Sequence, residues 1–242
     1  MYTEIKEKDI QILSFIDQHP CLSVKDINLF FDIKLSTLRK RINLLYEYKL
    51  ISFLRVSNRR GFRYYFSTKK GNKIIGNNLK TFSYIQDTYK QFFLPHILES
   101  NIFFINLKQY ALRNNYIFSD WVSDINTAKY FKYEGKAYKI IPDGFCIFNK
   151  NNIYLELDRS TETFFKILNK IDVYSNFYLS MEYKKYFDVF PKVIFIFPDI
   201  QRSEFIKNKV ESYIELKKYK EELNFFNFYD KSNFYNNLDK YL

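Results

Sequence analysis

Positive charge is concentrated in the first third of the chain, and this step in charge indicates two separate folding units. Between Lys34 and Lys80 there are thirteen Lys and Arg residues and one acidic residue, Glu47. Residues 1–80 carry a net charge of +9, whereas residues 81–242 carry +2 of the total of +11. Because 242 residues suit two small domains, we expect a basic module that binds a polyanion and a near-neutral module behind it.

The composition argues for a protein that does not enter a membrane. Hydrophobic residues make up 47% of the chain, but no uninterrupted apolar run approaches the roughly 18 residues that a membrane span needs. The cysteines, Cys21 and Cys146, lie far apart in the sequence, which favours neither a disulfide framework nor a thiolate metal site. We therefore expect a cytoplasmic protein with no membrane partner.

Three short helices are predicted in the basic module. Residues 7–18 have apolar side chains at helical spacing and end before Pro20, and Ser23 can cap a second helix. A third helix begins near Ser36, with its apolar stripe on one side. That stripe turns polar side chains outward or to the flank, at Ser36, Thr37, Arg39, Lys40 and Asn43.

A basic hairpin follows the third helix. Residues 51–57 and 62–67 are predicted strands, joined by a turn that contains Arg59, Arg60 and Gly61. Three helices and such a hairpin resemble a winged helix-turn-helix domain, in which the third helix enters the DNA major groove. Arg59 and Arg60 would form the tip of the wing, and Arg63 would add to its charge. The alternative is a winged helix that makes protein contacts and uses its charge for solubility.

The connection between the modules is predicted to be helical. Residues 68–79 and 82–94 have helical patterns, the second ending at Pro95, and Gly, Pro and Ser are too scarce for a flexible linker. We therefore expect domains at residues 1–80 and 96–242, with a connecting helix at 81–95. Symmetric DNA sites favour dimers, so a homodimer is expected.

The second module is predicted to be an α/β sandwich around a small mixed sheet. Its expected elements are a helix at residues 97–113, a strand at 138–148, a strand at 153–158, a helix from 159 to about 178, a core strand at 192–198 and a helix at 203–223.

The turn between the two hairpin strands decides which carboxylates face one another. A two-residue turn at Asn149 and Lys150 places Asp143 opposite Glu156, whereas a four-residue turn places it opposite Asp158. In both cases the three carboxylates share one face. Such a cluster is unfavourable unless cations neutralise it, and Mg²⁺ or Mn²⁺ would suit these oxygen ligands.

The residues around this hairpin resemble a known family. The run Pro142-Asp143-Gly144, then Glu156-Leu157-Asp158-Arg159-Ser160-Thr161, then Lys170 and Tyr174, after a winged helix, is similar to the plasmid replication-relaxation family. That resemblance implies a role in plasmid replication, DNA relaxation or mobilisation. The second module is also similar to the restriction-endonuclease-like PD-(D/E)xK nuclease fold, which implies that Asp143 and Glu156 are metal ligands.

One position departs from the nuclease pattern. Asp158 stands where the fold's lysine should follow Glu156 by two residues. An aspartate cannot polarise the scissile phosphate, although it can add a metal ligand. Lys170 or Lys166 from the next helix would have to supply the cation.

Several functions follow from these patterns. The leading one is a DNA-binding protein of a plasmid or other mobile element, with double-stranded DNA and a relaxase or replication initiator protein as partners. The first alternative is a Mg²⁺- or Mn²⁺-dependent endonuclease or nickase, with Asp143, Glu156, Asp158 and Lys170 as catalytic residues and no other cofactor. A transcription repressor, and an inactive nuclease-like domain whose carboxylates form a charge network, remain open.

Overall fold

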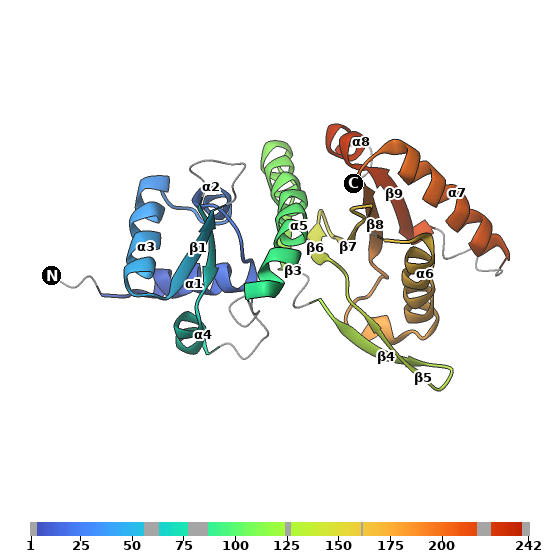
Figure 1. Cartoon of the computed structure of the whole chain (residues 1–242), viewed down its shortest axis with the longest axis horizontal. Helices are drawn as coiled ribbons and strands as arrows, with labels where there is room; N and C mark the ends of the chain where they lie inside the picture. Colours follow the sequence, from blue (N-terminus) through green and yellow to red (C-terminus); the bar gives the residue numbers. More distant parts are fainter. Residues whose placement is uncertain are drawn as a thin grey trace. The chain divides into compact units, whose positions relative to one another are not determined.

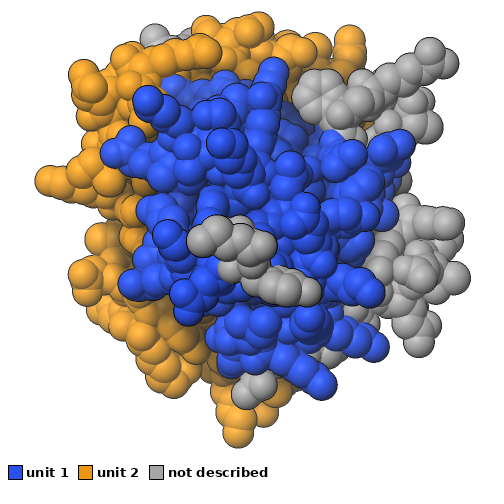
Figure 2. Space-filling model, turned by 90° about the vertical axis from the view of Figure 1, so that its left-hand side faces the viewer, with its two compact units in different colours: residues 1–109 blue, residues 110–242 orange. Residues whose placement is uncertain are grey.

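A computed structural model describes residues 4–55, 63–76, 87–123, 127–160, 162–216 and 224–238. The chain divides into two compact units, residues 1–109 and 110–242, which Figure 1 draws as ribbons and Figure 2 distinguishes by colour. The division falls within helix α5 (Asp87–Asn114), and the boundaries expected after residues 80 and 95 precede it. Among the described residues, no helix combines the length and apolar character needed to cross a membrane.

The first unit begins with three helices and a two-stranded hairpin. Its elements are α1 (Glu7–Gln18), α2 (Val24–Asn28), α3 (Leu35–Glu47), β1 (Ile51–Arg55), β2 (Arg63–Ser67) and α4 (Lys69–Ile75). Strands β1 and β2 pair antiparallel, and Leu22 forms a further bridge to Tyr65 of β2. This order and pairing are those of a winged helix-turn-helix, as expected. The turn with Arg59 and Arg60 lies outside the described residues.

Local sequence signals explain where these helices start. Ser23 accepts a hydrogen bond from the backbone N–H of Asp26 at 3.3 Å, and the Asp26 carboxylate accepts one from the backbone N–H of Ser23, so α2 starts with a capping box. Thr68 caps α4 in a similar way, accepting from the N–H of Gly71 at 3.1 Å. In α3 the fully buried residues are Leu38, Ile42 and Leu45, which leaves the opposite side of the helix facing solvent.

Helix α5 runs through Pro95, so the predicted break at this proline is wrong. A proline inside a helix removes one hydrogen bond and typically costs about 3 kcal/mol. The packing of the following turns opposes that cost: Ile97, Phe103, Phe104 and Leu107 are buried. Tertiary packing of an apolar face stabilises most helices in proteins more than local propensity does.

The second unit is built on a five-stranded mixed sheet with the strand order β3-β6-β7-β8-β9. The strands are β3 (Phe118–Ser123), β6 (Gly144–Phe148), β7 (Asn151–Leu157), β8 (Lys192–Phe197) and β9 (Phe226–Asp230). Strands β3, β6 and β7 are antiparallel neighbours, and β7, β8 and β9 are parallel. The expected mixed sheet is therefore present. Strands β3 and β9 were not predicted.

Two helices connect the parallel strands and share one core with them. Helix α6 (Phe164–Leu179) and the 3-10 helix η3 (Glu182–Lys185) lie between β7 and β8, and α7 (Ile200–Leu216) lies between β8 and β9. Ile171 of α6 and Val210 of α7 belong to the same buried cluster as Tyr154 and Phe195 of the sheet. Helix α8 (Lys231–Asn236) follows β9. Helices α6 and α7 start five residues later and three earlier than predicted.

A separate two-stranded ribbon projects from this unit. It consists of β4 (Lys129–Tyr133) and β5 (Lys136–Ile140), which pair antiparallel. Figure 1 shows it reaching away from the five-stranded sheet, next to α6. The sequence predicted a single strand over residues 138–148, whereas the chain leaves β5 at Ile140 and starts β6 at Gly144.

Candidate functional site

The polar side of α3 is exposed in the first unit. The residues predicted to contact DNA from this helix all lie on its solvent side, namely Ser36, Thr37, Arg39, Lys40 and Asn43. Arg63, at the start of β2, is exposed as well. A helix that turns a polar face to solvent from a three-helix bundle has the shape that fits a major groove.

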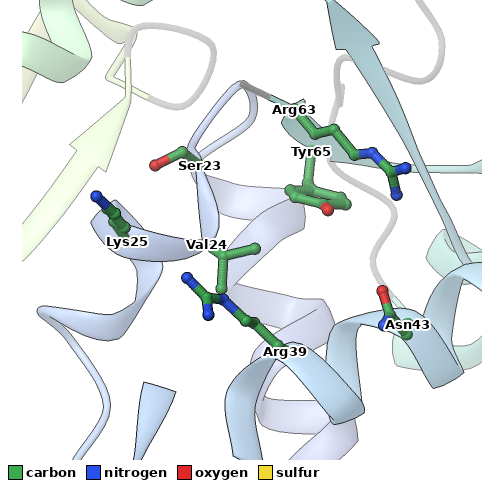
Figure 3. Close-up of a pocket in the computed structure, with 7 residues that line it drawn as sticks. All are labelled: Ser23, Val24, Lys25, Arg39, Asn43, Arg63 and Tyr65. Atoms are coloured by element: carbon green, nitrogen blue, oxygen red, sulfur yellow. The ribbon is translucent and has the colours of Figure 1, made fainter. Parts of the chain in front are cut away.

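A hollow of about 310 Å³ lies beside this face of α3. Figure 3 shows Arg39 and Asn43 on α3 and Arg63 on β2 around it, with Lys25 on the neighbouring helix α2. Three cationic side chains from three elements therefore line one hollow, and none of the described residues that line it is acidic. The lining residues are Ser23, Val24, Lys25, Arg39, Asn43, Arg63 and Tyr65. Such a hollow attracts anions, among them the phosphates of DNA.

Two arginines of this unit make contacts within the fold. The Arg41 guanidinium binds the carboxylate of Asp9, which is fully buried, so Arg41 holds α3 against α1. The Arg63 guanidinium lies 4.6 Å from the centre of the Phe53 ring, a cation–π contact that holds it over the hairpin. The sequence analysis did not single out Lys25. The apolar spacing in this segment predicts helix α2, but it does not indicate which polar residue of α2 lies near α3.

The second candidate site starts from the hairpin β6–β7. Phe148 pairs with Asn151, so the turn has two residues, Asn149 and Lys150, and both have positive φ angles, 44° and 71°. This is the backbone of a tight hairpin turn. The pairing extends to Gly144 and Leu155, which places Asp143 opposite Glu156, the first of the two predicted registers. The Asp143 carboxylate accepts a hydrogen bond from the backbone N–H of Leu157 at 2.7 Å.

Asp143 and Glu156 lie in one pocket with lysines from α6. The pocket has a volume of about 440 Å³. Its walls come from the end of β5, the hairpin and α6: Lys139, Ile140, Ile141, Asp143, Glu156, Glu162, Lys166, Asn169, Lys170, Val173 and Tyr174. Both lysines that the sequence offered as substitutes for the missing nuclease lysine, Lys166 and Lys170, are therefore at this pocket.

Glu156 is held by two side chains of α6. Its Oε2 is 2.8 Å from the Lys170 Nζ, and its Oε1 accepts a hydrogen bond from the Tyr174 hydroxyl at 2.6 Å. The pKa of Glu156 is raised to about 7, because the effect of burial, to which the charge of Asp143 adds, exceeds the opposing effect of Lys170 and of the hydrogen bonds from Lys170 and Tyr174. The carboxyl group can therefore change its protonation state near neutral pH.

Lys170 keeps its charge in this pocket. Burial alone would favour the neutral amine, but the carboxylates of Glu156, Asp143 and Glu162 outweigh it and raise the pKa of Lys170 above its ordinary value. The ammonium is 3.0 Å from the nearer Glu162 oxygen as well as in contact with Glu156. Burial and the charge of Glu156 also raise the pKa of Tyr174, so its hydroxyl remains a hydrogen-bond donor.

The predicted cluster of three carboxylates is not found, because Asp158 has other partners. The Arg202 guanidinium of α7 binds the Asp158 carboxylate, and the backbone N–H of Ser160 donates to the same carboxylate at 2.8 Å. Arg202 also donates to the backbone oxygen of Glu162 at 2.7 Å. Asp158 therefore fixes the loop between β7 and α6 to α7. Arg202 lies 44 positions from Asp158 along the chain, and no sequence pattern linked them.

The remaining pair of carboxylates fits a small divalent cation. In the described part of the chain no three His, Cys, Asp or Glu side chains are grouped as a metal site. Mg²⁺, however, commonly binds through one or two carboxylates and completes its shell with water and substrate phosphates. Asp143 and Glu156, opposite each other in a pocket, would supply such a pair.

Most of the chain matches a known protein family. The sequence profile described as replication-relaxation matches residues 13–193. The chain belongs to the replication-relaxation family. The match runs from α1 to β8, so the family region includes both the winged helix and the hairpin with Asp143 and Glu156. The resemblance read from the sequence is thereby confirmed at the level of the family.

Other comparisons add little to what is known of this replication-relaxation protein. A search of curated proteins finds no match. The transcriptional regulator SlyA is 15% identical over 29% of this chain and half of its own length, with a TM-score of 0.28. FabT of Streptococcus pneumoniae, solved in complex with DNA, is 18% identical over 46% of this chain and 70% of its own, with a TM-score of 0.29. Similarities this weak extend no inference to this chain.

Proposed function

We propose that this replication-relaxation protein binds duplex DNA through the exposed face of α3 and the adjoining hollow, and acts in the replication or relaxation of a plasmid or other mobile element. The observation that carries the proposal is the convergence of Lys25, Arg39 and Arg63 on one hollow beside the polar face of α3. Family membership supports the setting in replication. Arg39 and Asn43 then read base edges, and Lys25 and Arg63 bind the flanking phosphates.

Salt-dependent binding tests this proposal. Fluorescence anisotropy with a labelled duplex should show an affinity that falls as salt rises, because bound phosphates release counterions. Arg39→Ala and Arg63→Ala should each weaken binding by about ten-fold, and loss of one phosphate contact should reduce the salt slope by about 1. Lys73→Ala, which removes an exposed cation from α4, is the matched control. Equal effects of all three variants would show a non-specific charge effect and reject the proposed face.

The partners of this protein belong to the proposal too. A symmetric DNA site would be bound by a homodimer, which sedimentation at several concentrations tests; a monomer throughout removes it. A relaxase or replication initiator is the proposed protein partner at that site. A repressor would bind duplex DNA in the same way, but it would act on transcription.

A second candidate function is a metal-dependent DNA endonuclease of the PD-(D/E)xK type. It is favoured by the position of Asp143, Glu156 and Lys170 around one pocket, with Lys170 charged. Asp143 and Glu156 would hold Mg²⁺ or Mn²⁺, which would activate a water and neutralise charge on the phosphate. Lys170 would bind a phosphate oxygen, and Tyr174 would keep the Glu156 carboxylate oriented toward the pocket.

Supercoiled plasmid separates an active pocket from a charge network. With Mg²⁺ or Mn²⁺, an enzyme converts the plasmid to open circles, and Asp143→Ala abolishes the conversion. Asp188→Ala, which changes an exposed carboxylate elsewhere in the unit, should leave it intact. Plasmid that stays supercoiled with the wild-type protein would identify an inactive domain in which Lys170 serves only to neutralise Glu156 and Glu162.

A further inference from the structure

The ribbon β4–β5 has one face packed against the unit and one face open to solvent. On the packed face Phe131 lies opposite Tyr138, with ring centres 5.3 Å apart, and Phe131 also contacts Phe177 of α6 at 5.0 Å. On the open face Tyr130 lies opposite Lys139. Contacts of the packed face hold the ribbon against the unit, whereas the open face is turned to solvent.

The open face combines an exposed aromatic ring with lysines. Tyr130 is 68% exposed, and the Lys139 ammonium lies 5.2 Å from the centre of its ring. Lys132 lies two positions along the strand from Tyr130 and is also exposed. Over residues 129–140 there are four lysines and one acidic residue, Glu134. Bases stack on such a ring while lysines bind the neighbouring phosphates.

A hollow of about 370 Å³ borders this ring. The hollow is lined from the ribbon by Tyr130, Phe131, Lys132, Ala137 and Tyr138, and from η3 by the ion pair of Glu182 and Lys185. The alanine opposite Lys132 leaves room above the strand that a larger side chain would fill. The hollow therefore offers space for a flat base next to an aromatic face, with Lys132 on the ribbon side and the ion pair of Lys185 and Glu182 on the other.

Lys139 connects this surface to the acidic pocket. The same side chain that lies over Tyr130 also lines the pocket of Asp143 and Glu156. A nucleic-acid strand that passes over Tyr130 would therefore reach Lys139 next and then the carboxylates of Asp143 and Glu156. A duplex would have to present its bases from inside a groove, whereas a single strand exposes them for stacking.

We propose that the open face of the β4–β5 ribbon binds single-stranded nucleic acid, with a base stacked on Tyr130 and phosphates bound by Lys132 and Lys139, and that it directs the strand toward the acidic pocket. The direction toward the pocket rests on the proposed action of that pocket on DNA. The binding itself depends only on the ribbon.

Anisotropy with a fluorescein-labelled oligothymidylate tests the binding, without metal so that no cleavage interferes. Tyr130→Ala should weaken binding by about ten-fold, the loss expected for one stacked base. Tyr130→Phe keeps the ring and should bind within about two-fold of wild type. Phe165→Ala, which removes an aromatic side chain that is 75% exposed on α6, is the matched control and should have no effect.

The same samples are titrated with a blunt duplex, so that the two proposals fail separately. Tyr130→Ala should leave duplex affinity unchanged, because the first unit binds the duplex. If Tyr130→Ala binds the oligothymidylate as tightly as wild type, or weakens both ligands equally, the single-strand proposal is overturned. If the wild-type protein bound the oligothymidylate but not the duplex, the winged-helix proposal would be overturned and this one would stand.

Discussion

Arg39 and Arg41 are two positions apart in the same helix and have different tasks. Arg39 is exposed beside the basic hollow, whereas Arg41 neutralises Asp9, a carboxylate with no exposed surface. Removing one partner of a buried ion pair leaves an uncompensated charge and typically costs about 3–5 kcal/mol. Arg41→Ala should therefore lower the free energy of unfolding by about 3 kcal/mol, measured by chemical denaturation.

The neighbouring substitution provides the comparison. Arg39→Ala should change the free energy of unfolding by less than about 0.5 kcal/mol, as is usual for exposed residues, while it weakens duplex binding. If both variants were equally stable, the pair between Arg41 and Asp9 would contribute nothing to the fold. A charge count gives both arginines the same weight, and only the burial of Asp9 separates them.

His19 makes the stability of the first unit depend on pH. It is 3% exposed, and burial lowers its pKa from 6.5 to about 3. Between pH 6.5 and 3 the unfolded chain protonates this histidine and the folded chain does not, so stability is present above pH 6.5 and falls as the pH decreases. Relative to His19→Gln, wild type should lose up to about 1.4 kcal/mol per pH unit in this range. If the free energies of unfolding of wild type and His19→Gln changed in parallel from pH 7 to pH 5, the prediction would be contradicted.

Among the elements, α4 depends on a glycine where it meets the rest of the first unit. A Cβ atom on Gly71 would lie 2.2 Å from the backbone oxygen of Leu50 and 3.1 Å from a methyl carbon of Leu13. Neither backbone oxygen nor buried leucine can move freely, so Gly71→Ala should destabilise the unit by about 3 kcal/mol, the upper range for overpacking. Thermal unfolding followed by circular dichroism measures the loss.

Gly76 is the matched control for this prediction. It ends α4 with φ +64°, and its Cβ would meet nothing within 4 Å. Gly76→Ala should therefore cost only the backbone strain of the left-handed conformation, about 1 kcal/mol. A larger loss for Gly76→Ala than for Gly71→Ala would show that the close approach of α4 is not what requires the glycine.

Elements with strong local signals were predicted well, and elements formed by tertiary pairing were not. Helices α1 and α3 were predicted because their apolar residues repeat at helical spacing, and α2 was predicted from its cap at Ser23. Strand β9 pairs only with β8, whose partner residues are far away in sequence, so its aromatic residues Phe226 and Phe228 gave no strand signal of their own. Strand β4 has the sequence Lys-Tyr-Phe-Lys-Tyr, in which apolar and polar residues do not alternate strictly, so it gave no clear strand signal.

At the scale of the whole molecule, the sequence located the two sites better than it described them. It predicted Arg39, Asn43 and Arg63 as DNA contacts, and the structure brings these three to one hollow. It also named Asp143, Glu156 and Lys170, which share one pocket. It could not separate Asp158 from that group, because strand periodicity fixes a side but not the partner that a distant helix contributes. Arg202 of α7 is that partner.

The two proposed nucleic-acid sites lead to a prediction about composite substrates. If a duplex with a single-stranded tail contacts the face of α3 and the β4–β5 ribbon at the same time, the second contact is intramolecular. Such a substrate should bind at least ten-fold more tightly than either part alone. Arg39→Ala and Tyr130→Ala should each reduce its affinity toward that of the remaining part. Equal affinities for tailed and blunt duplexes would mean that one chain does not use both sites on the same molecule.

The contact between Asp158 and Arg202 makes a single substitution to lysine at position 158 unfavourable. Exchanging Asp158 for the lysine of the nuclease pattern would set two cations against each other and remove the acceptor for the Ser160 N–H. Recovery of that lysine would therefore require Arg202 to change at the same time. Any engineered form with lysine at 158 should therefore also carry an uncharged or acidic residue at 202.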